Sequence, residues 1–224
     1  MKWFLRNWDQ VAVALLEHVQ ITLTAIAIAA VLSLAIGVWA ARSDRVFRVA
    51  LTLSGILYTI PTLAFLALLI PVVGLGKTNA ILCMVAFSLM IMIRNVATGL
   101  RDVPRDVVDA AEGMGMRRFQ VLTRIELPLA LPVIVAGLRI ATVTVISVTV
   151  VAAYVNAGGL GTLIFAGISN DFAPKIWAGA LTACALAVAA DLGLAQVEGW
   201  LRRRTGGLPP SAVALALPEA ADAR

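Results

Sequence analysis

Residues 19–41, VQITLTAIAIAAVLSLAIGVWAA, contain no charged side chain and are long enough to cross a lipid bilayer as a helix. A membrane-spanning helix needs about 20 apolar residues, because no water is present to satisfy its backbone polar groups. The stretch is longer than the roughly 7–15 apolar residues of a signal peptide, and no small-residue cleavage pattern leads from it into a polar chain. We therefore predict a permanent first membrane span.

The rest of the 224-residue chain has the same character, with 61% apolar residues, 14% charged residues and a mean hydropathy of +0.94. Soluble domains are nearer half apolar and a quarter charged. Four further apolar segments reach spanning length, and the second span is interrupted at Pro61. These segments cover residues 49–72, 78–99, 132–155 and 176–197. We expect an all-α integral membrane protein with about five transmembrane helices, in which residues 1–200 form a single membrane domain.

Arginines gather on one side of the predicted spans. They follow the first span, fill the segment between the third and fourth, and follow the fifth: Arg42, Arg45, Arg48, Arg101, Arg105, Arg117, Arg118, Arg124, Arg202, Arg203 and Arg204. Because cytoplasmic loops are enriched in Lys and Arg, we predict that the N-terminus is outside and the C-terminus inside. Residues 201–224 are then a disordered cytoplasmic tail.

The chain offers little material for catalysis or metal binding. It has one histidine, and Cys83 and Cys184 lie in apolar runs without metal-ligand spacing, so no metal site and no catalytic residue are predicted. Residues 76–78, GKT, resemble the end of a phosphate-binding loop, but the full pattern requires glycine where Pro71 stands. The net charge of +5 is scattered between apolar runs, which does not favour nucleic-acid binding.

Residues 100–131 form an amphiphilic segment on the predicted cytoplasmic side. We expect Asp102 to cap a helix with Pro104 in its first turn, and a second short helix over residues 116–124 to end before Pro128. Such a loop either presents itself to a partner or packs on its own bundle, and composition leaves both open. The expected apolar side of the first helix consists of Val103, Val107, Ala110, Ala111 and Met114.

Within this segment, DAA at 109–111, Gly115 and IELP at 125–128 match the spacing E-A-A-x3-G-x9-I-x-L-P. The chain resembles the ABC importer permeases that carry this motif, with Asp109 where the family usually has Glu. The resemblance implies that the loop forms a coupling helix, which docks on a separate cytoplasmic ATPase subunit. The implied coupling residues are Asp109, Ala110, Ala111, Gly115, Ile125, Leu127 and Pro128.

Other segments resemble osmoprotectant uptake permeases in particular, namely residues 59–71 with 74–77, 93–100 and 157–167. The resemblance implies a transporter subunit of the bacterial cytoplasmic (inner) membrane, not an enzyme, that moves glycine betaine, choline or carnitine by alternating access. A permease for another small solute, such as an amino acid, is the alternative. The implied partners are an ATPase dimer that binds ATP and Mg, a second permease subunit of the same or similar sequence, and an extracytoplasmic solute-binding protein. No cofactor is expected in this chain itself.

Two sets of residues within the membrane zone are hypotheses for function. Gly158, Gly159 and Gly161 can turn the chain back toward the membrane, which predicts an outer gate, with an ordinary surface turn as the alternative. The candidate pathway or gate residues are Tyr58, Pro61, Asn156, Gly158, Gly159, Gly161 and Phe165. Arg139 and Asp191 both lie toward the cytoplasmic ends of their spans and can form an ion pair, whereas Arg94 and Arg139 can instead snorkel to the interface.

Overall fold

Long apolar runs become long helices in the computed structural model, which describes residues 2–205. Within these residues no strand is present, as backbone in a hydrocarbon environment requires unless a barrel closes. Four continuous helical stretches are long and apolar enough to cross a membrane. They are α2 (Trp8–Arg42), α5 (Lys77–Arg101), the stretch Arg118–Val155 and α10 (Ala173–Arg204).

The second predicted span consists of two helices, α3 (Asp44–Thr59) and α4 (Thr62–Val73), whose axes are bent by 99°. Ile60 and Pro61 are extended, with ψ of 126° and 132°. Steric clash with a following proline keeps the preceding residue, here Ile60, out of the helical region. The interruption expected at Pro61 is therefore confirmed, and it divides the predicted segment 49–72 into two helices. The described chain has four spans, or five if the bent pair crosses as one.

Several helices extend beyond the predicted spans. Helix α2 begins at Trp8 instead of residue 19, and the fourth span is helical from Arg118 instead of residue 132. Helix α10 runs to Arg204, so the first residues of the predicted tail 201–224 are helical. The rest of that tail, residues 206–224, lies outside the described part of the chain.

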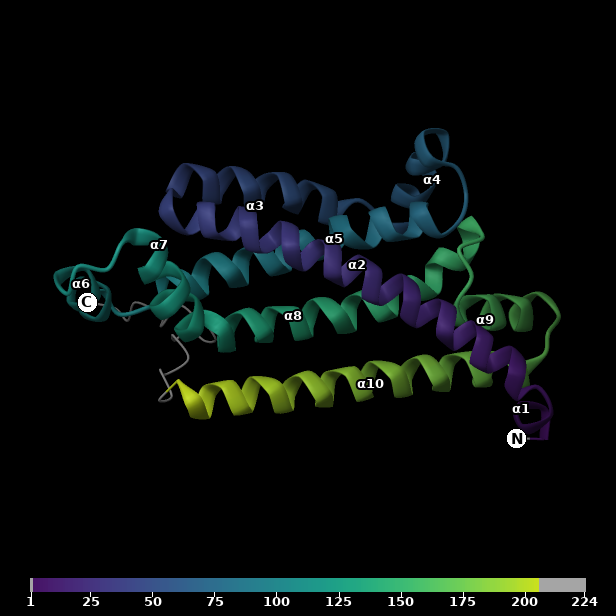
Figure 1. The fold of residues 1–224 in the computed structure, drawn as a ribbon. Coiled ribbons are helices and arrows are strands. Elements are labelled where there is room, and N and C mark those ends of the chain that lie inside the picture. Colours follow the sequence, from purple (N-terminus) through teal and green to yellow (C-terminus); the bar gives the residue numbers. More distant parts are fainter. Residues whose placement is uncertain (1, 206–224) are drawn as a thin grey trace, which may run out of the picture.

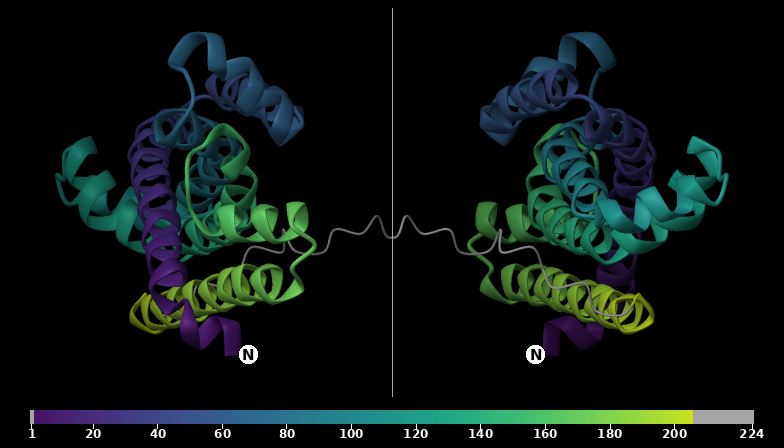
Figure 2. Two further views of the ribbon diagram at one scale, coloured as in Figure 1. Left: turned by 90° about the vertical axis from the view of Figure 1, so that its right-hand side faces the viewer. Right: turned by 90° about the vertical axis from the view of Figure 1, so that its left-hand side faces the viewer.

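Helix α5 lies at the centre of the bundle and packs against α2, α3, α4 and α8 (Leu127–Thr149) (Figure 2). Its buried face includes Ala80, Cys83 and Met84, so Cys83 is a packing residue. Cys184, in contrast, is exposed on α10.

Glycines bring the neighbouring helices close to α5. A Cβ atom added at Gly37 of α2 would lie 2.5 Å from Cγ1 of Val96, and one added at Gly137 of α8 would lie 2.4 Å from Cβ of Asn95. Because glycine has no side chain, α2 and α8 can approach α5 closely at these two points. Such close approach at small residues is a usual basis of helix association in membranes.

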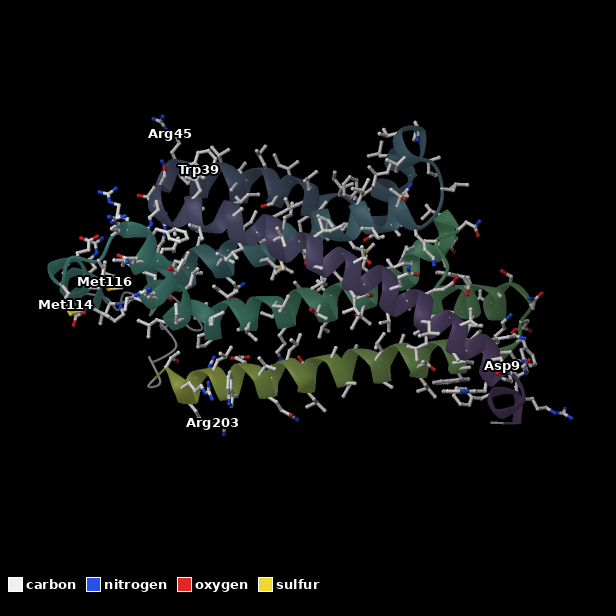
Figure 3. All side chains as sticks on the ribbon, viewed as in Figure 1. Asp9, Trp39, Arg45, Met114, Met116 and Arg203 are labelled. Carbon is white, nitrogen blue, oxygen red and sulfur yellow. The ribbon has the colours of Figure 1, made fainter. Side chains whose placement is uncertain are left out.

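The two ends of the bundle differ in charge. The ends of α2, α5 and α10, with Arg42, Arg101 and Arg202–Arg204, lie together with the loop that follows α5, and we call this the arginine-rich end (Figure 1). The opposite end carries α1 (Lys2–Arg6), the start of α2 and α9 (Leu160–Ser169). Figure 3 shows Arg45 and Arg203 at the first end and Asp9 at the second.

Two glycine substitutions, one at the opposite end and one as a control, test how tightly that end is packed. A Cβ atom at Gly161 would lie 1.9 Å from the carbonyl oxygen of Val150, whereas one at Gly55 has no heavy atom within 4 Å. We expect Gly161→Ala to lower the free energy of unfolding by about 1–3 kcal/mol through overpacking. Gly55→Ala should leave it unchanged or raise it by about 0.5–1 kcal/mol. Thermal unfolding of the purified variants measures both, and an equal melting midpoint for the two would contradict this packing.

Candidate functional site

The loop at the arginine-rich end begins where α5 ends. Asp102 has helical dihedral angles at the C-terminal cap of α5, and the N-cap position of the next helix is Pro104 instead of Asp102. Helix α6 (Arg105–Gly113) instead follows Pro104, which is extended with ψ of 132°. Proline is well suited to the position before a helix, because its φ is fixed and it has no amide hydrogen that would be left without a partner there.

The glycine of the motif ends α6. Gly115 has φ of +83°, its amide donates to the carbonyl oxygen of Glu112 at 2.9 Å, and the amide of Met116 donates to that of Ala111 at 3.2 Å. These two bonds satisfy carbonyl groups that a helix end leaves free, and the left-handed residue between them is usually glycine. The spacing between Ala111 and Gly115 is thus explained by helix termination.

Helix α6 buries a narrower face than its periodicity predicts. Ala111 is buried, and so is Val103 just before the helix, but Val107, Ala110 and Met114 are exposed, against expectation. Met114 is 77% exposed and Phe119 is 73% exposed. In Figure 3 the side chain of Met114 lies at the far tip of the loop. Apolar side chains that stay this exposed on a small helix suit contact with another protein.

The chain returns to the bundle without a break. Helix α7 (Arg118–Val121) and the π-helix η1 (Leu122–Glu126) continue directly into α8, so the second short helix does not stop before Pro128. Proline has no amide hydrogen for the helical ladder, and a turn of π-helix before it is a known way to accommodate such a disturbance. Of the motif residues in this part, Ile125, Leu127 and Pro128 are half-buried.

Arginine side chains fasten this loop to the ends of α2 and α3. The guanidinium of Arg42 donates to the carboxylate of Glu126, which is buried. That of Arg101 donates to the carboxylate of Asp44 at 2.9 Å and to the carbonyl oxygen of Ala40 at 2.7 Å. Sequence analysis assigned no role to Glu126, although a lone carboxylate between apolar residues is a signal for a buried partner.

At the opposite end, two side chains of α2 hold the turn before α9. The carboxylate of Glu17 accepts the amide of Gly159 at 3.0 Å, and Nδ1 of His18 accepts the amide of Leu160 at 3.4 Å. Nδ1 acts as acceptor here, so Nε2 carries the proton and donates to the carbonyl oxygen of Ile146 at 3.0 Å. Sequence analysis missed both roles, though a single histidine in an apolar run was the available signal.

The predicted pathway residues fall in two groups. Tyr58 and Pro61 lie at the bend between α3 and α4, where the ring of Tyr58 meets that of Phe87 with centroids 5.7 Å apart. The remaining five lie in or beside the turn between the 3₁₀-helix η2 (Val150–Val155) and α9: Asn156, Gly158, Gly159, Gly161 and Phe165. Close packing and backbone conformation explain the glycines of this turn. The gating role stays a prediction.

Asn156, Gly158 and Gly159 all have positive φ, as a tight turn requires. A Cβ atom at Gly158 would lie 2.3 Å from Oε2 of Glu17, so the turn must pass close to α2. Phe165 pairs with Tyr154, with ring centroids 4.3 Å apart.

Arg139 of α8 and Asp191 of α10 form a two-point ion pair, with Nε to Oδ1 at 2.5 Å and Nη2 to Oδ2 at 2.8 Å. Glu198 extends the pair, because it lies 3.6 Å from Arg139 and 2.7 Å from Arg202. Over the part of α10 that the structure describes, the other buried residues are Ala178 and Gly179 near its start. This charge network therefore links the second half of α10 to α8.

Residues 19–203 match the family described as "Binding-protein-dependent transport system inner membrane component". The chain belongs to this family. It is 37% identical over 202 residues to the glycine betaine/carnitine/choline transport system permease protein OpuCD of Bacillus subtilis, covering 90% of this chain and 86% of that protein. It is 36% identical over 211 residues to the choline transport system permease protein OpuBD of the same organism, covering 92% and 93%. As a family member, the chain is a transport component of the membrane and not an enzyme.

Solved structures share the helical arrangement of this permease. A chain of the inward-facing MetNI methionine ABC transporter superposes with a TM-score of 0.77 at 20% identity, over 87% of this chain and 97% of that one. A chain of an amino acid ABC transporter, solved with histidines, gives a TM-score of 0.69 at 15% identity, over 90% and 96%. These comparisons confirm the expected fold class.

The link between Arg42 and Glu126 can be tested by comparison with a neighbouring arginine. Arg42→Gln leaves the buried carboxylate of Glu126 without its cation, so we expect the free energy of unfolding to fall by about 2 kcal/mol. Arg45→Gln removes the same charge from an exposed side chain and should change little. Equal melting midpoints for the two purified variants would show that the ion pair does not hold the loop.

Proposed function

We propose that this permease carries a small quaternary ammonium osmoprotectant, such as glycine betaine, carnitine or choline, into the cell. The support is the identity of 36–37% to permeases named for these solutes, which extends over most of both chains. The motif segments 59–77, 93–100 and 157–167 agree with this assignment.

The loop around α6 is the proposed docking site for a cytoplasmic ATPase, which binds ATP and Mg. Its small, exposed residue Ala110 allows close approach, and Asp109 is an exposed carboxylate at the same helix turn. The exposed Met114 and Phe119 supply apolar contact area. Because the ion pair of Arg42 with Glu126 fixes the loop to the bundle, movement of the loop is passed to the membrane helices.

The arginine-rich end is cytoplasmic in this proposal, and the end with α1 and α9 is extracytoplasmic, where a solute-binding protein delivers the cargo. Residues 1–200 act as one permease domain, and a second permease subunit completes the pathway. The transport cycle is alternating access between two packings, and ATP and the loaded binding protein bias which packing is populated. The turn held by Glu17 and His18 is the proposed outer gate.

Uptake into proteoliposomes tests the cargo. The permease is reconstituted with its ATPase and binding protein, and uptake of radiolabelled glycine betaine, carnitine and choline is measured with and without internal ATP. We expect uptake that requires ATP. Excess unlabelled amino acids should not reduce this uptake. A complex that hydrolyses ATP and moves an amino acid but none of these three solutes would contradict the proposed cargo.

The coupling role of the loop can be tested at two nearby glycines. Gly115 has φ of +83°, where an L-residue costs about 1–2 kcal/mol, so we expect Gly115→Ala to distort the end of α6 and to reduce ATP-driven uptake several-fold. Gly113 is helical with open space around it, and Gly113→Ala should retain uptake. ATP hydrolysis and uptake are measured on the same preparations. Full uptake with Gly115→Ala would contradict the coupling role.

A further inference from the structure

One stripe of α5 carries an arginine inside the apolar helix, two turns before its end at Arg101. Phe87, Arg94 and Arg101 are each seven residues apart, so they lie on nearly the same face of the helix. At one end of the stripe, Phe87 meets the ring of Tyr58. At the other end, Arg101 pairs with Asp44 at 2.9 Å. Both partners belong to α3, so Arg94 lies midway along the part of α5 that borders α3.

Arg94 is exposed, and it makes no hydrogen bond or ion pair with any residue that the structure describes. The arginines around it differ, since Arg42, Arg101 and Arg139 each pair with a carboxylate. An ionisable group inside a span is costly and normally marks a partner or a transport path.

The helices packed against α5 offer no acid at this depth. Helices α4 and α8 contain no Asp or Glu, and the one acid of α3, Asp44, already pairs with Arg101. The acids of α2, Asp9 and Glu17, lie toward the opposite end. The neighbouring Asn95 turns toward Ile91, whose carbonyl oxygen accepts its side-chain amide at 2.8 Å. A carboxylate that reaches Arg94 must therefore come from outside the described chain.

We propose that Arg94 binds the carboxylate of the transported solute, while the ring of Tyr58 receives its quaternary ammonium group. This inference rests on the proposed function, because glycine betaine and carnitine carry both groups. A guanidinium binds a carboxylate through two parallel hydrogen bonds, and an aromatic face attracts a quaternary ammonium. Tyr58 is 40% exposed, so its ring is available.

Tyr58 and Arg94 lie along the same border between α3 and α5. Phe87, which contacts Tyr58, precedes Arg94 by two helical turns, or about 10 Å along the axis. Side chains in a helix lean toward its N-terminus, which brings the guanidinium of Arg94 toward Phe87 and Tyr58. A small zwitterion can then bridge the remaining gap.

Choline distinguishes carboxylate binding by Arg94 from a structural or coupling role of this residue. Choline has the quaternary ammonium group but a hydroxyl in place of the carboxylate. The experiment measures maximal uptake of glycine betaine, carnitine and choline at saturating loaded binding protein, in proteoliposomes with the complete complex. The variants are Arg94→Gln, Arg94→Lys and Tyr58→Leu. Arg45→Gln is the matched control, since it removes an exposed arginine that lies away from this stripe.

For Arg94→Gln, we expect the rates for glycine betaine and carnitine to fall about 10-fold or more, while the rate for choline stays near that of the unaltered permease. Arg94→Lys should give intermediate rates for the two zwitterions and also spare choline. Tyr58→Leu should lower all three rates, and Arg45→Gln none. Retained choline uptake shows that the Arg94 variants assemble.

Two results would overturn the assignment. Equal losses for all three solutes with both Arg94→Gln and Arg94→Lys would give Arg94 a structural or coupling role. Unchanged rates for all three would mean that its side chain extends to the lipid headgroups at the arginine-rich end. Failure of the unaltered permease to move any of the three solutes would instead overturn the proposed cargo.

Discussion

The close approach of α2 and α8 to α5 is the constraint on which the rest of the structure depends. Gly37 and Gly137 leave room for Val96 and Asn95, so three long helices pack around one another at a distance that any larger residue would prevent. Lipid chains are as apolar as the helices, and burial of apolar area alone therefore provides little association energy in a membrane. Close packing of small residues provides it instead, and it fixes the ends of the helices where the functional parts are attached.

Charged and polar side chains then tie the loop around α6 and the turn before α9 to helix ends. Arg42 holds Glu126 where that loop returns to the bundle, and Glu17 with His18 holds the turn before α9. Helix α2 thus contacts both the loop at one end of the bundle and the turn at the other. A shift of α2 relative to α5 would be felt at both ends, which is the property that alternating access requires.

The sequence alone predicted the parts that follow from local rules. The apolar runs gave the spans, Pro61 gave the break, and the spacing of Asp109, Gly115 and Pro128 gave the loop. The same rules placed the cap of α6 at Asp102 and the end of the second short helix before Pro128. The N-cap position is Pro104 instead, and the helix continues past Pro128 into α8. The partners of Glu126 and His18 lie 84 and 128 residues away in the chain, and no local pattern encodes such contacts.

The central claim is that the loop around α6 lies on the cytoplasmic side and docks the ATPase, and cysteine labelling tests it most directly. Cysteines introduced one at a time as Asp109→Cys or Asp9→Cys, in a chain that carries Cys184→Ala and keeps the buried Cys83, are treated with an impermeant maleimide in inside-out vesicles. The account predicts that position 109 reacts in the permease alone and is protected once the ATPase binds, and that position 9 does not react. Labelling of position 109 that the ATPase leaves unchanged, or labelling of both positions from the same side, would contradict it.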